Sequence, residues 1–186
     1  LSQGDEPARE SALEHLLLAH QLKNADPETV DVLEHLLCEA KRYDDCTAVL
    51  QTARRMSRVR TDERRWLARE ATIRWKDLGD IDEAEKMFRR IRATDPRSLE
   101  ALAFYEDYFD RNQDWKRLHA VLSQKLNVVD AVERVDVAIQ MAEVAEHSMR
   151  NLDKAIDAYK RVLAEIPGEN RASDRLIALY EKSGKW

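Results

Sequence analysis

Glycine, proline and cysteine are scarce in this 186-residue sequence, which contains four glycines, four prolines and two cysteines. The glycines stand alone, so no Gly-rich phosphate-binding loop is present, and two cysteines are too few for a disulfide framework. No apolar run approaches the roughly 18 to 20 residues that a membrane-spanning helix needs. No signal-peptide pattern is visible, and the default expectation is therefore a cytoplasmic protein without a membrane-spanning segment.

Charged residues, by contrast, are abundant and make up 36% of the chain, with a formal net charge of −5. Many charged and apolar residues with few helix breakers are typical of long helices. The acidic balance argues against a nucleic-acid-binding surface, because such surfaces neutralise phosphates with lysine and arginine.

The chain repeats itself. The segment 79–96 recurs 71 residues later as 150–167, and apolar residues fall on apolar residues throughout. A finer period lies inside this repeat, because one large apolar residue follows each polar turn at spacings of 38, 34, 37 and 34 residues. These residues are Tyr43, Ile81, Trp115, Leu152 and Trp186. A step of 34 residues is the length of a two-helix hairpin, so the sequence predicts an array of hairpins.

The segment 79–96 resembles the second half of a tetratricopeptide repeat (TPR), which has a small residue, an aromatic residue and a closing proline in this order. Ala84, Phe88 and Pro96 fill these places, and the equivalent residues of segment 150–167 fill them again. Other hairpins depart from the pattern, with Cys46 and Leu118 at the small-residue place. The related HAT variant, which uses more tryptophan, is an alternative.

This resemblance implies an all-α, right-handed superhelix of about five antiparallel hairpins. We expect the hairpins over residues 7–41, 44–78, 81–111, 115–149 and 152–183, as one array cut from a longer protein. Short polar links between amphipathic helices predict antiparallel neighbours, and stacking buries the apolar face of each hairpin. Asp26-Pro27 and Asp95-Pro96 are predicted to begin helices. Thr61, Asp80, Asp114 and Asp130 are expected to cap others.

Residue patterns for catalysis or metal binding are missing. HExxH, CxxC and GxSxG do not occur, and no two of the five histidines lie three or four residues apart. A metal site assembled from distant helices stays open as an alternative. Cys46 lies where helices approach closely and is expected to pack as a small apolar residue, although a redox pair or disulfide with Cys38 is also open. We therefore expect no enzyme, no cofactor and no metal.

Basic residues gather once, with seven arginines between positions 54 and 69. Several end a predicted helix, where cations interact favourably with the helix dipole. The functional alternative is a positive patch for an acidic peptide or an anionic head group, with nucleic acid as a further alternative.

Candidate partner-binding residues follow from the expectation that the first helix of each hairpin lines a concave groove. Aromatic residues and arginine carry much of the binding energy in interfaces, and a groove that is positive near residue 65 and acidic beyond it suits an extended partner of mixed charge. Trp66 and Phe104 lie off the best apolar stripe and are expected to anchor a ligand. The candidates are Arg65, Trp66, Arg69, Phe104, Asp107, Asp136 and Gln140.

The sequence thus predicts a non-enzymatic scaffold that binds a protein or peptide and is monomeric or weakly self-associating through its end repeats. One alternative is a structural spacer or self-association module of a large multi-repeat protein. Another is the regulatory region of an enzyme whose catalytic domain lies elsewhere, and RNA binding is a third.

Overall fold

A computed structural model describes residues 13–14, 17–18 and 26–184 of the chain. All elements within residues 26–184 are helices, which confirms the all-α prediction. The helix expected over about 7–23 and the role expected for Trp186 concern residues outside the described ranges. The chain divides into two compact units, Leu1–Pro96 and Arg97–Trp186, and each unit is described by itself.

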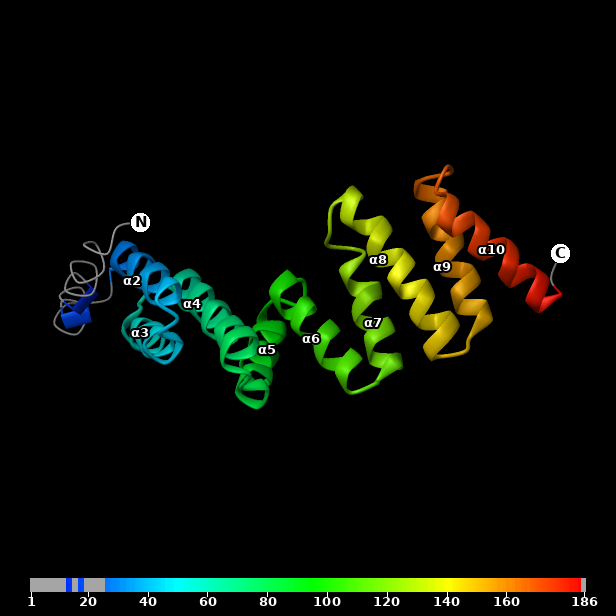
Figure 1. Cartoon of the computed structure of the whole chain (residues 1–186). Helices are drawn as coiled ribbons and strands as arrows, with labels where there is room; N and C mark the ends of the chain where they lie inside the picture. The colour runs from blue at the N-terminus through cyan, green and yellow to red at the C-terminus, as the bar shows by residue number, and fades with distance from the viewer. Residues whose placement is uncertain (1–12, 15–16, 19–25, 185–186) are drawn as a thin grey trace, which may run out of the picture. The chain divides into compact units, whose positions relative to one another are not determined.

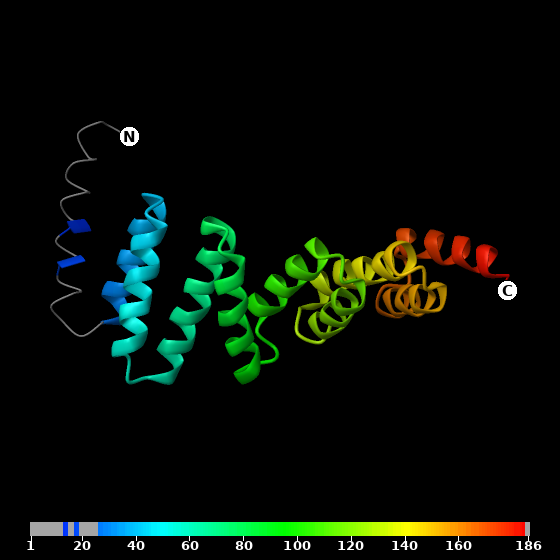
Figure 2. The ribbon, with the colours of Figure 1, turned by 90° about the horizontal axis from the view of Figure 1, so that it is seen from below.

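The helices of each unit follow one another in sequence and pack as antiparallel neighbours (Figures 1 and 2). The first unit contains α2 (Pro27–Glu39), α3 (Tyr43–Met56), α4 (Arg60–Ile73), the π-helical turn η1 (Arg74–Leu78) and α5 (Ile81–Thr94). The second contains α6 (Leu99–Arg111), α7 (Trp115–Lys125), α8 (Ala131–Glu143), the π-helical turn η2 (Val144–Ser148), α9 (Leu152–Glu165) and α10 (Asn170–Ser183). Because each helix packs mainly on its neighbours in sequence, the architecture is that of a TPR-like helical repeat.

Aspartate side chains begin several helices as the sequence predicts. The carboxylates of Asp26, Asp80, Asp114 and Asp130 each accept a hydrogen bond from a backbone N–H of the first turn. These N–H groups have no partner within the helix, so the caps satisfy them.

Two predicted helix starts are wrong. Pro96 does not begin α6, because this helix starts at Leu99, and the Ser98 hydroxyl accepts the capping bond from the Ala101 N–H at 3.3 Å. Thr61 does not cap α4, since this helix begins at Arg60 and is preceded by Val59, which makes no side-chain cap. A serine after the proline offers the oxygen that the N-terminal N–H groups need.

The core of each unit is built from the residues that carry the TPR resemblance. Ala84 and Phe88 of α5 are completely buried, and Ala155 and Tyr159 of α9 are buried at the equivalent places. Cys46 is also completely buried, as expected for the small-residue place. Small residues at these places let neighbouring helices approach closely, so the residues that recur in the repeat are those that pack between helices.

The two cysteines touch each other in this core. Their Sγ atoms lie 3.7 Å apart, and both are free thiols. Burial raises the pKa of both thiols, and the neighbouring Cys38 raises that of Cys46 further. The thiols therefore pack as small apolar groups in this state.

Candidate functional site

The predicted positive groove of the first unit is an ion-pair cluster between α2 and α4. The Arg65 Nη1 lies 3.2 Å from the Asp31 carboxylate, and the Arg69 Nη1 lies 2.8 Å from the same group. Arg69 also donates to the carboxylate of Glu34. The structure thus brings the two predicted arginines together, but α2 supplies acidic partners that the sequence analysis did not assign to them.

The cluster is partly shielded from water. Burial raises the pKa of Glu34, and this effect outweighs the opposing influence of Arg69. The side chains of Arg65, Arg69 and Asp31 remain 37–39% exposed. A partner can therefore reach both charge signs on one surface, with the side chains held in place by their mutual bonds.

The two predicted aromatic anchors are wrong as surface residues, because both rings lie in the core. Trp66 is 1% exposed and belongs to a cluster with α2, α3 and Ile73, while Phe104 is completely buried. The Phe104 ring centroid lies 5.2 Å from that of Tyr105 and 5.6 Å from that of Tyr108. The apolar stripe of each helix is wider than the sequence pattern suggested, so these rings pack against neighbouring helices.

The predicted residues of the second unit do not form one cluster. The Gln140 side chain on α8 donates to Glu106 on α6 at 2.8 Å, and Asp107 pairs with Arg111 on its own helix at 2.9 Å. Asp136 is 79% exposed, with its nearest cation, Arg171, at 3.8 Å. These side chains therefore make separate local contacts.

A link that the sequence analysis missed joins three helices of this unit. The Lys125 Nζ lies 3.0 Å from Glu106 on α6 and 3.2 Å from Glu133 on α8. Burial lowers the pKa of Lys125, but the bonds to the two carboxylates outweigh it and leave the pKa raised. Lys125 therefore remains charged and ties α6, α7 and α8 together.

A second missed feature is the buried carboxylate of Glu70 on α4, which is completely inaccessible to solvent. It accepts hydrogen bonds from Gln51 at 2.9 Å and Arg74 at 3.3 Å, and from Arg54. A buried carboxylate is rare unless it is paired. The signal in the sequence was a glutamate on the apolar stripe of α4, three residues after Leu67.

The arginine cluster of the sequence divides into two groups with different environments. Arg54, Arg65 and Arg69 pair with carboxylates of other helices. The other four are exposed, and no side chain of the described residues pairs with them: Arg55, Arg58, Arg60 and Arg64. The structure therefore does not gather the seven arginines into one positive patch.

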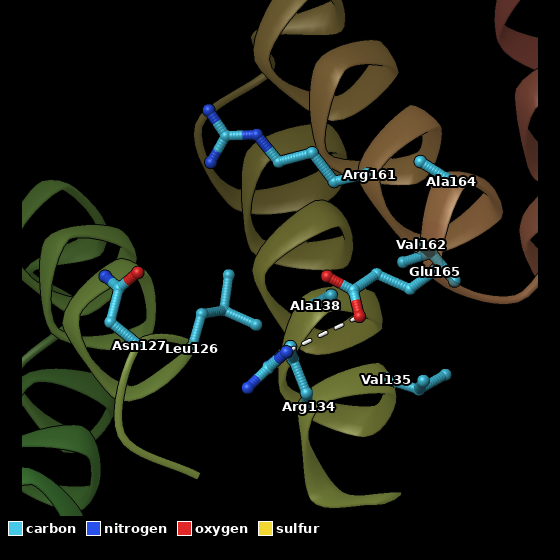
Figure 3. A pocket seen from close by; sticks show the side chains of 9 residues that line it. All are labelled: Leu126, Asn127, Arg134, Val135, Ala138, Arg161, Val162, Ala164 and Glu165. Atoms are coloured by element: carbon cyan, nitrogen blue, oxygen red, sulfur yellow. Dashed lines mark hydrogen bonds and ion pairs between the residues drawn. The ribbon is translucent and has the colours of Figure 1, made fainter. Parts of the chain in front are cut away.

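Two larger pockets lie in the second unit. One has a volume of about 670 Å³ at the ends of α7 and α9 and the start of α8 (Figure 3). The other has a volume of about 790 Å³ at the starts of α7 and α9 beside η2. A smaller pocket of about 270 Å³ lies among α3, α4 and α5 of the first unit.

Within residues 26–184 and the two short pieces before them, no group of histidine, cysteine, aspartate and glutamate residues has the arrangement of a metal site. None of the helices in the same part of the chain has the length and apolar character to cross a bilayer.

No protein-family model matches the sequence, and no curated protein matches it. Among solved structures, the MamA protein aligns over 86% of this chain and 85% of its own, with 18% identity and a TM-score of 0.57. A MamA RS-1 double mutant aligns over 88% of both chains, with 13% identity and a TM-score of 0.62. At these identities the likeness concerns the fold alone. A thermophilic TPR protein of Thermus thermophilus aligns with 19% identity and a TM-score of 0.42 over 92% of this chain and 90% of its own.

Proposed function

We propose that this protein is a non-enzymatic scaffold that binds a protein or peptide on the face of its first unit that α2 and α4 form. The main support is the ion-pair cluster of Asp31, Glu34, Arg65 and Arg69, which holds charged side chains of both signs in fixed, accessible positions. A surface that is organised before binding loses little conformational entropy when a partner docks.

The partner that suits this face is an extended segment carrying both acidic and basic residues. An acidic side chain of the partner would compete with Asp31 for Arg65, and a basic one would meet Asp31 and Glu34. Charges of this kind steer encounter and select partners more than they add affinity. In the second unit, Asp107, Asp136 and Gln140 remain predicted partner-binding residues and form a separate part of the proposal.

The experiment is quantitative co-purification of the tagged protein from its native cells, followed by mass spectrometry. The variant is Arg65→Gln with Arg69→Gln, because reversal to glutamate would place like charges beside Asp31 and Glu34. The matched control is Arg60→Gln with Arg64→Gln, which removes the same charge from exposed arginines of the same helix. We expect a stoichiometric partner that the control retains and the first variant loses.

Equal recovery of that partner with both double variants would contradict the proposed face. Recovery of the folded protein without any partner would contradict the proposal that it is a scaffold.

A further inference from the structure

The two pockets of the second unit lie at opposite ends of one pair of helices. Trp115 and Lys116 at the start of α7 and Lys154 near the start of α9 line the first pocket. Leu126 at the end of α7 and Arg161 toward the end of α9 line the second. Since α7 and α9 are each antiparallel to α8, they run in the same direction. We call the surface between these two helices, from one pocket to the other, the α7–α9 furrow.

Helical spacing connects the pockets along this furrow. On α7, Trp115, His119 and Leu126 lie at positions i, i+4 and i+11, which share one face of a helix. On α9, Lys154 and Arg161 lie seven residues apart on one face. Burial lowers the pKa of His119, and the charges of Lys154 and Arg161 lower it further.

The furrow is positive although the protein as a whole carries a net charge of −5. Lys116, Lys154 and Arg161 are exposed, and no carboxylate of the described residues pairs with their side chains. Two carboxylates also line the pockets, and each is already paired: Asp114 lies 3.4 Å from Arg117, and Glu165 lies 3.5 Å from Arg134. Figure 3 shows Arg161 extending away from that ion pair, toward the α7 side of the pocket.

Apolar side chains form the floor at both ends. Leu126, Val135, Ala138 and Val162 line the pocket at the end of α7, and each is buried or half-buried. Trp115 and Met149 line the other pocket, and both are half-buried. An occupant with apolar side chains would cover these surfaces, which gives the furrow a hydrophobic contribution in addition to its charge.

From these observations we infer that the α7–α9 furrow is a second binding surface, separate from the face named under the proposed function, and that it takes an acidic peptide segment with apolar anchors. Its carboxylates would pair with Lys154 and Arg161, and its apolar side chains would enter the pockets at the two ends. The 14 residues of α9 extend over about 21 Å. An extended segment of about six or seven residues spans this length.

The first unit offers an internal comparison, because Arg90 occupies the place of Arg161 in the 71-residue repeat. Arg90 is also exposed and lines the small pocket among α3, α4 and α5. That pocket is lined almost entirely by polar and charged side chains, and Met87 is its one apolar lining residue. The pocket of the first unit therefore contains the exposed arginine but lacks the apolar floor, and we expect no acidic peptide with apolar anchors to bind there.

The test is fluorescence anisotropy with the full chain and a labelled ten-residue peptide of alternating aspartate and leucine. We expect binding that weakens when salt is raised from about 50 mM to about 500 mM, because exposed charges are screened. Arg161→Glu is expected to weaken binding about tenfold, because reversal replaces attraction by repulsion. The matched substitution Arg90→Glu is expected to change the affinity less than about twofold, because it makes the same charge reversal at a residue outside the furrow.

Two further probes test the occupant. Peptides with lysine for every aspartate, or serine for every leucine, are expected to bind at least about tenfold more weakly, because each loses one of the two contributions. A photo-crosslinker on the aspartate–leucine peptide is expected to label α7 or α9, and circular dichroism confirms that both variants are folded.

Equal effects of Arg161→Glu and Arg90→Glu, or crosslinks confined to the first unit, would overturn the furrow as the site. Tighter binding of a single-stranded oligouridine than of the acidic peptide would overturn the occupant. The Arg65/Arg69 variant leaves these residues untouched, so the failure of one proposal does not affect the test of the other.

Discussion

Gly79 and Arg150 occupy the same place in the 71-residue repeat, and both adopt the left-handed backbone conformation, with φ of 68° and 51°. Each lies two residues before the large apolar residue that opens the next helix, Ile81 or Leu152. Lys41 and Gln113 hold the same offset before Tyr43 and Trp115, and both have a φ of 55°. The turn that leads into α3, α5, α7 and α9 therefore has one recurring geometry, although glycine fills it only once among these four.

Arg150→Gly is expected to stabilise the protein by about 0.5–1 kcal/mol, because a non-glycine residue in this conformation is strained and glycine is not. Gly79→Ala is expected to cost about 1 kcal/mol through strain alone, since a Cβ at this position would meet nothing within 4 Å. Urea denaturation measures both. Gly168→Ala is the control, because Gly168 does not have a positive φ and its Cβ also has free space. If Gly79→Ala and Gly168→Ala changed the free energy of unfolding equally, the left-handed conformation at Gly79 would impose no strain on alanine.

Glu70→Ala is expected to destabilise the protein by about 3–5 kcal/mol, because removal of one partner from a buried ion pair leaves the other charges uncompensated. Arg54 and Arg74 would lose their shared acceptor in a nearly dry environment. Lys86→Ala breaks an exposed pair with Glu83 and is expected to cost less than about 1 kcal/mol. Similar denaturation midpoints for the two variants would show that the buried ion pairs of Glu70 stabilise the protein no more than the exposed pair does.

The stability of the protein is expected to fall as pH decreases through the ordinary pKa of histidine, in part because of His119. Its pKa is lowered in the folded state, first by burial and then by Lys154 and Arg161. The unfolded chain therefore binds the proton more readily, and acid favours unfolding. His119→Asn should lose less stability than the wild type between about pH 7.5 and pH 5.5. NMR titration should show a higher pKa for His119 in Arg161→Gln but not in Arg90→Gln.

The two cysteines are expected to react slowly with a thiol-specific reagent near neutral pH while the protein is folded. Burial raises the pKa of both thiols, and the thiolate is the reactive form. Absorbance of the released chromophore should rise promptly only after denaturant is added. Cys46→Ala removes the completely buried thiol and isolates the half-buried Cys38. Rapid reaction of both thiols in the folded protein would favour the redox pair that the sequence leaves open.

The repeat determined most of what the sequence analysis predicted correctly. The recurrence of Ala84 and Phe88 as Ala155 and Tyr159 indicated buried contacts, and those residues are buried. The capping aspartates were also recognisable, because capping depends on residues only a few positions apart. Patterns of this kind arise from residues that are close in the sequence, so helices and their core faces can be predicted from the sequence alone.

The candidate site depended on contacts between helices. Arg65 and Arg69 were recognised as cations, but their pairing with Asp31 and Glu34 joins residues 34 to 38 positions apart. Trp66 and Phe104 were placed on the surface because their burial depends on which neighbouring helix covers them. The furrow between α7 and α9 likewise depends on how α8 holds those two helices.

The sequence by itself determined an all-helical repeat, its period and the small and aromatic residues of its core, because helix periodicity and capping are local properties. Only the tertiary structure decided which charges are neutralised, which aromatic rings are buried and where pockets open. Electrostatic pairing and burial depend on distances between helices, and those distances are set when the helices pack.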